Sequence, residues 1–338
     1  MMSDFIAADP NQSSRPEKRL TVVIPHFNQK DFLPRAVASS LQGETGEIEI
    51  IIVDDGSTDD SAVVADELAQ QNVQEIRVIH QSNTGPGPAR EAGRRASSGE
   101  FIQYLDSDDV LLPRKFELQV AGLRDHPERD VAYGKTRFRR LNQPPQDVPW
   151  KRTGEHIDKM FPSFLRSRWW GTSTPLYRRR VTDRAGSWIA LLSEEDWEYD
   201  CRIAAAGARL HYVPEFVSEQ RDHSGERLTG AGTSGEVKLR SRAVAHKLVL
   251  SHAKRAGITE EYPEMKHFAR ELFLLSRQCG AAGLEEESQG LFALAREASG
   301  EARGNGWDFR LYGFLASLVG WRRLGKMACY SDVMRFDR

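Results

Sequence analysis

The sequence predicts an α/β fold whose sheet is mostly parallel, and two observations lead to this prediction. Short runs dense in valine and isoleucine, typical of buried strands, alternate with segments that carry apolar residues at helical spacing. This alternation, repeated along the first third of the chain, is typical of parallel sheets with right-handed crossovers. The composition agrees, because 39% hydrophobic and 28% charged residues are sufficient for a packed core.

Four strands and three helices are expected in the first third of the chain. The strands are RLTVVIP (19–25), IEIIIVDD (48–55), IRVIH (76–80) and EFIQYLD (100–106). The helices lie within 29–42, 57–72 and 85–98. The first places Phe32, Ala36, Val37 and Leu41 on one face, and the second opens with an N-cap cluster at 57–60.

The remainder of the chain predicts further elements and a domain boundary. A helix is expected in 113–127, strands in 130–138, 172–186 and 208–215, and a proline-rich surface loop at 141–150. A helix with an acidic start is expected at 191–207, closed by Gly207. From about Gly235 the pattern is helical. We therefore expect a flexible arm at 1–18, an α/β domain at 19–230 and a helical region at 231–338.

The bulk composition excludes several classes of protein. A formal net charge of −2 provides no overall field that attracts nucleic acid. The sequence has no apolar run of about 18 residues or more, so no transmembrane helix is expected. Residues 1–19 lack the apolar segment of a secretory signal. Three widely spaced cysteines, Cys201, Cys279 and Cys329, fit a reducing compartment, and we expect a cytoplasmic protein.

Polar or glycine-rich segments follow each of the four expected strands. They are PHFN (25–28), DDGS (54–57), QSNTGPG (81–87) and DSDD (106–109). The carboxyl ends of parallel strands lie along one edge, which is where open α/β sheets bind ligands. We therefore expect these four segments to form one ligand-binding rim.

The DSDD segment indicates a metal site. If the backbone stays extended, Asp106 and Asp108 point to the same side. Carboxylate oxygens suit Mg²⁺ or Mn²⁺, which commonly add substrate phosphates as further ligands. The alternative is that Asp108 or Asp109 caps the following helix, which explains one acid well but three poorly.

Other polar residues are weaker candidates when each is taken alone. Asp54 and Asp55 at a strand end could accept hydrogen bonds from a base or ribose, and Arg90 could face the rim or be an ordinary surface residue. In SEEDWEYD, an acid could remove a proton from a hydroxyl, with Trp197 partly desolvating it; the usual alternative is acids that complement a helix N-terminus. His223 alone is a weak metal-ligand candidate. Trp169 and Trp170 fit a core pair or a surface for stacking sugars.

The order of these motifs is more specific than any single one. PHFN, VDDGSTDDS, NTGPGPAR, FIQYLDSDD, RRRVTDRAG, EEDW and a late RxH follow one another along the chain. This set resembles the inverting glycosyltransferases of family 2, which have the GT-A fold for nucleotide-diphosphate sugars. The resemblance covers about Leu20 to Thr229, and so implies that 19–230 is a GT-A catalytic domain.

The resemblance implies a role for each matching residue. The donor nucleotide would contact Pro25, Phe27, Asn28, Asp54, Asp55, Arg90, Asp106 and Ser107, with Asp55 at the uracil. The metal would be held by Asp108, Asp106 and His223, and the ED pair is Glu195 with Asp196, the latter as general base. One departure is Glu91, where the family often has asparagine.

The expected activity is therefore metal-dependent, inverting transfer of a sugar to a hydroxyl. The donor would be a nucleotide-diphosphate sugar, and the resemblance implies a UDP-sugar. The cofactor would be Mn²⁺ or Mg²⁺. The acceptor would be a glycan or a lipid-linked glycan in surface polysaccharide biosynthesis. A nucleotidyltransferase is one alternative, but PHFNQKDF contains no glycine for a phosphate loop. A nucleotide-sugar-binding protein without transfer activity is another, which the presence of both acidic motifs disfavours.

The helical region is less informative. The segment FRLYGFLASLVGWRRLGKMA (309–328) has a broad apolar face and ends in basic residues. We expect it to dock on the α/β domain. The alternative is a helix lying at the inner face of a membrane, near lipid-linked acceptors.

Overall fold

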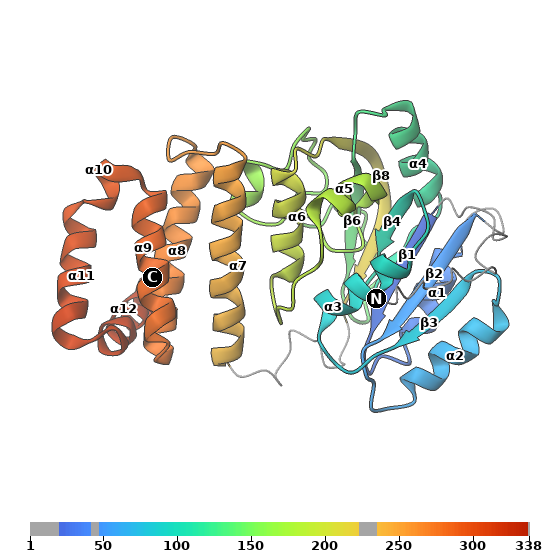
Figure 1. The fold of residues 1–338 in the computed structure, drawn as a ribbon, viewed down its shortest axis with the longest axis horizontal. Helices are drawn as coiled ribbons and strands as arrows, with labels where there is room; N and C mark the ends of the chain where they lie inside the picture. The colour runs from blue at the N-terminus through green and yellow to red at the C-terminus, as the bar shows by residue number, and fades with distance from the viewer. Residues whose placement is uncertain (1–19, 42–46, 223–234, 337–338) are drawn as a thin grey trace, which may run out of the picture.

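The structure, a computed structural model, describes residues 20–41, 47–222 and 235–336. One sheet with helices on both faces occupies one end of the molecule, and an array of helices extends from it to the other end (Figure 1). The sheet has eight strands in the order β3-β2-β1-β4-β7-β6-β8-β5. The strands are β1 (Leu20–His26), β2 (Ile48–Asp54), β3 (Ile76–His80), β4 (Phe101–Tyr104), β5 (Val110–Leu111), β6 (Val131–Arg139), β7 (Leu176–Arg178) and β8 (Leu210–Arg221).

The first four strands pair in parallel, as the sequence predicts. The second half of the sheet is mixed, because β7 lies antiparallel between β4 and β6, while β6 and β8 are parallel. The short strand β5 pairs antiparallel with β8 and was not expected, since its two residues are too few to form a pattern. The mixed, mostly parallel sheet of the prediction is thus confirmed.

Among the described residues, six helices belong to the α/β part of the chain. They are α1 (Leu33–Ser40), α2 (Ser61–Gln71), α3 (Pro86–Ala96), α4 (Lys115–Asp125), α5 (Arg179–Ala185) and α6 (Glu195–Ala205), with a short 3₁₀ helix at Ser163–Leu165. Alternate residues of β1 show which helices cover each face of the sheet. Val22 and Ile24 pack in the cluster with side chains of α1, α2 and α4, while Val23 packs in the cluster with α3, α5 and α6.

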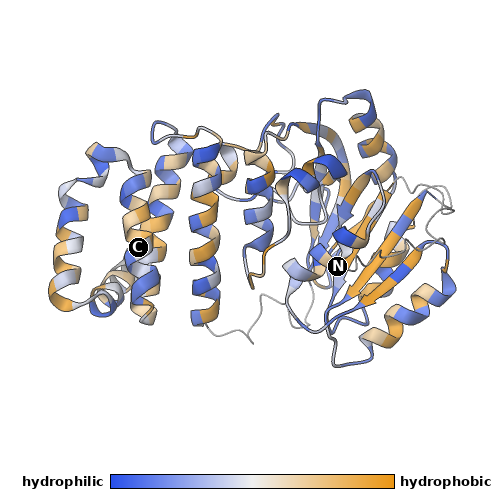
Figure 2. Ribbon diagram, viewed as in Figure 1, coloured by the Kyte–Doolittle hydropathy of each residue, from blue (hydrophilic) through white to orange (hydrophobic). Residues whose placement is uncertain are grey.

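Within residues 235–336, the helical region consists of six helices that follow β8. They are α7 (Gly235–Arg255), α8 (Pro263–Ala282), α9 (Glu285–Ala298), α10 (Gly300–Gly304), α11 (Trp307–Val319) and α12 (Trp321–Phe336). Helices α6, α7, α8 and α9 stand side by side, so α7 joins the helical array to the α/β part (Figure 1). Apolar residues form one continuous cluster from the sheet through α6 and α7 to α9 (Figure 2).

The expectation that segment 309–328 docks on the α/β domain is wrong. Helix α11 packs instead against α8 and α9 of the helical array. The ring of Phe309 lies 5.3 Å from that of Phe273 and 5.7 Å from that of Phe292. The docking surface is formed by α7 together with part of α8, which a pattern of apolar residues alone could not distinguish from their neighbours. None of the described helices is both long and apolar enough to cross a membrane.

Helix α3 lies unusually close to β1 because of one glycine. A Cβ atom added at Gly93 would lie 2.3 Å from Cγ1 of Val23, a distance that a folded protein does not tolerate. Since Val23 is fully buried on the central strand, the helix would have to move away from the sheet.

We predict that Gly93→Ala lowers the free energy of unfolding by about 1–3 kcal/mol, the usual cost of overpacking a core. The matched control is Gly290→Ala in the interior of α9, where an added Cβ meets nothing within 4 Å. That change should raise stability by about 0.5–1 kcal/mol through helix propensity. Urea denaturation of both variants measures the difference, and equal effects would contradict the close approach.

Candidate functional site

The first two strand ends meet at the predicted rim and are linked by Asn28. Asn28 has a left-handed backbone, with φ of 51°. Its side-chain oxygen accepts a hydrogen bond from the Thr58 backbone amide at 2.8 Å, and its backbone amide donates to the Ser57 hydroxyl at 3.1 Å. Pro25 is buried in β1 beyond the last residue paired with β4, and Phe27 is partly exposed next to it. The turn after β1 and the turn after β2 therefore form one rigid unit.

The two aspartates that end β2 have different surroundings. Asp54 is buried, accepts a hydrogen bond from the Ser57 amide at 3.2 Å and lies 3.1 Å from Nδ1 of His80. Burial by itself would raise the pKa of Asp54, but its hydrogen bonds outweigh burial and lower it. Asp55 accepts hydrogen bonds from the amides of Thr84 and Gly85, at 3.0 and 2.8 Å. Asp55 thus fixes the glycine loop that leads into α3.

Arg90 occupies the centre of the site and joins two acidic motifs. Its guanidinium donates to Asp106 and to Glu195, in each case at 2.8 Å, and its side chain is only 5% exposed. The indole of Trp188 lies against it, with the guanidinium carbon 5.0 Å from the ring centroid. The sequence left open whether Arg90 faces the rim, and the structure places it there. This one side chain holds Asp106 and Glu195 together, although they lie 16 and 105 residues further along the chain.

The DSDD segment is a turn and not a continuation of β4. The strand ends at Tyr104, and the Asp109 amide donates to the Asp106 carbonyl at 3.0 Å. The expectation that an extended backbone puts Asp106 and Asp108 on the same side therefore does not apply. Ser107 is buried, and its hydroxyl donates a hydrogen bond to the side chain of Gln29.

Asp109 does not cap the next helix, which corrects that part of the prediction. Helix α4 begins at Lys115, after the two-residue strand β5. Asp109 is buried and accepts hydrogen bonds from the Ser173 hydroxyl at 2.7 Å and from the Arg221 amide at 3.4 Å. It therefore joins the turn after β4 to the end of β8, a contact that sequence spacing cannot reveal.

The charges in this turn fit a divalent cation. Burial, followed by the nearby charges of Asp108 and Asp106, raises the pKa of the Asp109 carboxyl well above its usual range. The turn thus brings three carboxylates together, and a cation held by Asp106 and Asp108 would lower their mutual repulsion. The described residues contain no cluster of three or more metal-ligating side chains, and the predicted third ligand, His223, lies outside them.

The EED motif begins α6, as expected for an acidic helix start. Glu194 takes a left-handed backbone, with φ of 62°, and Glu195 and Asp196 form the first turn. Burial and the neighbouring Asp196 raise the pKa of Glu195, although Arg90 opposes them. Burial would also raise the pKa of Asp196, but Arg168 and Arg90 reverse this and lower it. Asp196 is therefore the more readily ionised acid of the pair.

Two cations beside Asp196 were missed by the sequence analysis. Arg168 forms ion pairs with Asp196 and with the fully buried Asp200, the latter at 2.6 Å. Nζ of Lys151 donates to the Trp170 carbonyl at 3.3 Å. Burial, followed by the charge of Arg168, lowers the pKa of Lys151 to about 8. Both residues lie in the irregular segment between β6 and β7, where no periodic pattern indicates their role.

The tryptophans match their predicted roles only in part. Trp197 does not cover the acids: its Nε1 donates to the Phe164 carbonyl at 2.9 Å, and its ring meets His246 and Phe268 of the helical region edge-on. Trp169 and Trp170 are buried core residues, so of the two predicted roles the core role is correct. Trp188, which the sequence did not single out, is the tryptophan that packs on Arg90.

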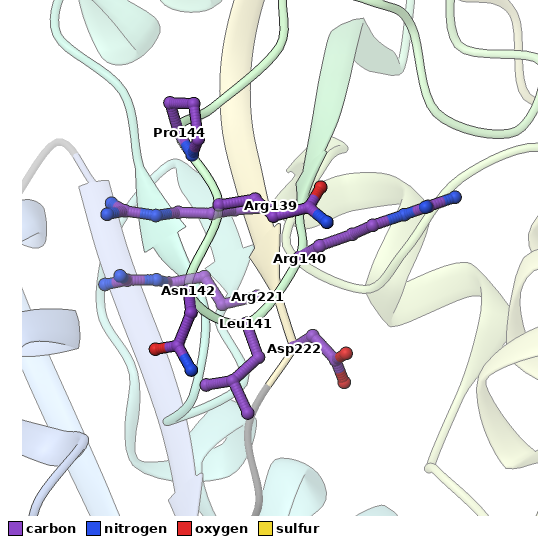
Figure 3. A pocket seen from close by; sticks show the side chains of 8 residues that line it. Arg139, Arg140, Leu141, Asn142, Pro144, Arg221 and Asp222 are labelled. Atoms are coloured by element: carbon purple, nitrogen blue, oxygen red, sulfur yellow. The ribbon is translucent and has the colours of Figure 1, made fainter.

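A basic cavity lies at the ends of β6 and β8. It has a volume of about 440 Å³ and is lined by Arg139, Arg140, Leu141, Asn142, Gln143, Pro144, Arg221 and Asp222. Figure 3 shows the side chains of Arg139 and Arg221 pointing the same way, with Arg140 pointing away from them. Burial, followed by the charges of Arg35 and Arg139, lowers the pKa of Arg221, while Glu219 lies 3.5 Å from its Nε. The Arg221 amide bonded to Asp109 places the cavity beside the DSDD turn.

Comparison with known proteins relates the chain to one family. The family model described as "Glycosyl transferase family 2" matches residues 21–180. An uncharacterized glycosyltransferase of Nostoc sp. is 42% identical over 99 residues, which are 29% of this chain and 31% of that protein. The putative glycosyltransferase EpsH of Bacillus subtilis is 32% identical over 217 residues, 60% of this chain and 61% of that protein. These matches thus span less than two thirds of either relative.

The whole described fold has a structural counterpart. The crystal structure of S. aureus TarS residues 1–349 in complex with UDP-GlcNAc superimposes with a TM-score of 0.67 at 17% identity. The similarity covers 93% of this chain and 92% of that chain, and so includes the helical region. The predicted GT-A fold with a C-terminal helical region is confirmed.

Glu91, the residue that departs from the family pattern, supports the site through its hydrogen bonds. It is buried and accepts hydrogen bonds from Arg94 at 2.9 Å, from Arg95 at 2.7 Å and from the Trp188 amide at 3.3 Å. Burial by itself would raise the pKa of Glu91, but the two arginines outweigh it and lower the pKa to about 2. Glu91 thus holds Trp188 in place against Arg90.

We predict that Glu91→Gln lowers the free energy of unfolding at pH 7 by about 2–3 kcal/mol. Because the pKa of Glu91 is lower in the folded state, its contribution is complete above the unfolded pKa of about 4.5. It is lost as the pH falls from there towards about 2, so wild type and variant should converge in acid. Urea denaturation across this range tests it, with exposed Glu67→Gln as control; a difference that persists unchanged below pH 3 would contradict it.

Proposed function

Through residues 21–180 the chain belongs to glycosyl transferase family 2, and we propose that it transfers a sugar with inversion from a nucleotide-diphosphate sugar to a hydroxyl acceptor. The observation that carries this proposal is the bridge made by Arg90 between Asp106 and Glu195. This bridge brings the donor motif and the ED motif of the family to one place. A nucleotidyltransferase or a protein that only binds nucleotide sugars would not need both.

We propose a UDP-sugar as the donor. The structural relative TarS is described in complexes with UDP-GlcNAc and with UDP, although likeness at 17–18% identity extends to the fold alone. In this chain Pro25, Phe27 and Asn28 would meet the nucleotide, with Asp54 and Asp55 at the base and ribose. Asp55 also holds the glycine loop through the Thr84 and Gly85 amides, so binding of the base at Asp55 would affect the position of that loop.

We further propose that Mn²⁺ or Mg²⁺ binds with the donor, held by Asp106 and Asp108 and by His223. Burial, followed by the charges of Asp108 and Asp106, raises the pKa of Asp109, and this grouping of carboxylates supports a cation there. When bound, such an ion neutralises charge that develops on the departing diphosphate. Arg90, Ser107 and the amides of the DSDD turn would orient the donor beside it, and the arginines of the basic cavity would add to the positive potential.

Asp196 is proposed as the general base. Its lowered pKa keeps it ionised at neutral pH, so it can accept the proton of an acceptor hydroxyl as that oxygen attacks the anomeric carbon. Arg168 fixes the orientation of this carboxylate by its ion pair and by its second partner, Asp200. Glu195, with its raised pKa, is tied to Arg90 and would position the donor side.

The acceptor is proposed to be a glycan or a lipid-linked glycan of a surface polysaccharide. A cytoplasmic location is part of this proposal, in agreement with the wide spacing of the three cysteines in the sequence.

We predict that Asp196→Asn lowers the rate of transfer by about 10²–10⁴ while the donor still binds, as expected when a general base is lost. Asp108→Asn should abolish transfer and also remove the thermal stabilisation by UDP that depends on Mn²⁺. A panel of UDP-sugars with Mn²⁺ provides the donor, and UDP release together with product formation measures the rate. Asp125→Asn, an exposed acid at the end of α4, is the control. Unimpaired transfer by Asp196→Asn would refute the base assignment.

The ion pair of Arg168 gives a pH prediction. Without its charge, burial would dominate and the pKa of Asp196 would rise, so Arg168→Gln should move the acidic limb of the kcat/KM profile to higher pH. The control Arg166→Gln changes an exposed arginine on the same segment and should leave the profile unchanged. A folded Arg168→Gln protein with the wild-type acidic limb would show that Asp196 is not the group that titrates.

A further inference from the structure

Helix α11 exposes an apolar stripe that the fold does not use. Its outer face carries Trp307, Leu311, Phe314 and Leu318, spaced by four, three and four residues, which places them in line on a helix. They are 77%, 46%, 60% and 64% exposed, respectively. Large apolar side chains gathered on one exposed face mark an interaction site more often than single exposed residues do.

The opposite face of α11 already supplies its contact with the protein. Phe309 and Ala316 are buried there, and Tyr312 lies 5.0 Å from the ring of Phe273 and 5.7 Å from that of Phe292. The helix is therefore apolar on two sides, one packed against α8 and α9 and one facing outward at the end of the molecule remote from the sheet (Figures 1 and 2). Packing within this chain explains only the inner side.

The charges around the stripe are mostly positive, and the one acid of α11, Asp308, is paired with Arg303 at 2.6 Å. Between residues 309 and 330 the chain contains four basic residues and no acid. The four are Arg310, Arg322, Arg323 and Lys326, and all are exposed. On α12, Arg322, Arg323 and Lys326 share the exposed surface with Met327 and Tyr330, which are 66% and 71% exposed. We call Trp307, Leu311, Phe314 and Leu318, together with these four cations, the terminal surface.

We propose that the terminal surface binds the surface of an anionic lipid bilayer, with α11 lying in the plane of the interface. Apolar side chains including a tryptophan, next to lysines and arginines, are the composition of interfacial helices. Each cation near an anionic membrane contributes to binding through the negative surface potential. With 13 residues, α11 is too short to span the hydrocarbon core, for which about 20 residues are needed, so it lies on the bilayer.

The charge pattern favours a bilayer over a second copy of this chain. A symmetric contact between two terminal surfaces would bring four cations of one copy towards four of the other, and like charges across an interface oppose association. Anionic lipid headgroups supply the opposite charge. Contact with the membrane would hold the catalytic sheet near acceptors that are themselves anchored in lipid, although the binding itself does not depend on the proposed activity.

Vesicle flotation of the full-length protein tests this proposal. Vesicles of phosphatidylcholine mixed with phosphatidylglycerol should carry the protein upward in a density gradient, and vesicles of phosphatidylcholine alone should carry much less. The double variant Phe314→Ser with Leu318→Ser should reduce partition into the mixed vesicles on the order of a hundredfold, because most of the inserted apolar area is lost. Changing Arg322, Arg323 and Lys326 to Gln should reduce it by roughly tenfold to a hundredfold on mixed vesicles and little on neutral ones.

Val63→Ser on α2 is the matched control, since it removes an equally exposed apolar side chain from a different surface and should leave flotation unchanged. Absence of flotation by the wild-type protein with the mixed vesicles would overturn the proposal. So would a dimer in sedimentation velocity that Phe314→Ser with Leu318→Ser converts to a monomer, because the stripe would then be a protein interface. Sugar transfer to a soluble acceptor, measured for the same double variant, tests the proposed enzymatic function separately from membrane binding.

Discussion

The arrangement of the site depends on one buried cation. The Arg90 guanidinium lies between the carboxylates of Asp106 and Glu195, so a residue of α3 joins the turn after β4 to the start of α6. Two carboxylates this close to each other would repel without it, and a buried arginine without them would be strongly destabilised. Since each of the three groups requires the other two, the donor side and the acceptor side of the site are built as one unit.

The acids at the start of α6 face two different parts of the molecule. Glu195 and Asp196 face the site, while Glu194 and Glu198 face the helical region, where Arg242 and His252 bind them at 3.0 and 2.7 Å. The helical region is therefore more than an appendage of the sheet. It supports the helix that carries the ED motif, which gives a physical reason why the described structure and TarS share both parts of the fold.

The electrostatics of the two acidic motifs differ in a way that suits their proposed roles. In the DSDD turn, burial and the charges of Asp108 and Asp106 raise the pKa of Asp109, whereas Arg168 and Arg90 lower the pKa of Asp196. A turn that gathers three carboxylates suits a divalent cation and the phosphates that accompany it. A carboxylate beside two guanidiniums stays ionised and keeps one orientation, which a base that meets a neutral hydroxyl requires.

The sequence by itself determined the class of fold, the first four strands and the order of the motifs, because these depend on periodicity and on local turn chemistry. Arg90 and Glu195 could be named from the motif order, but their ion pair could not be predicted. Only the tertiary structure decided that Arg168 pairs with Asp196, that Asp109 joins β8 and that Trp197 faces the helical region, since these contacts join residues with no regular spacing. It also decided that α11 packs on other helices and leaves an apolar stripe outside, because a helix that is apolar on two sides does not reveal from its sequence which side is buried.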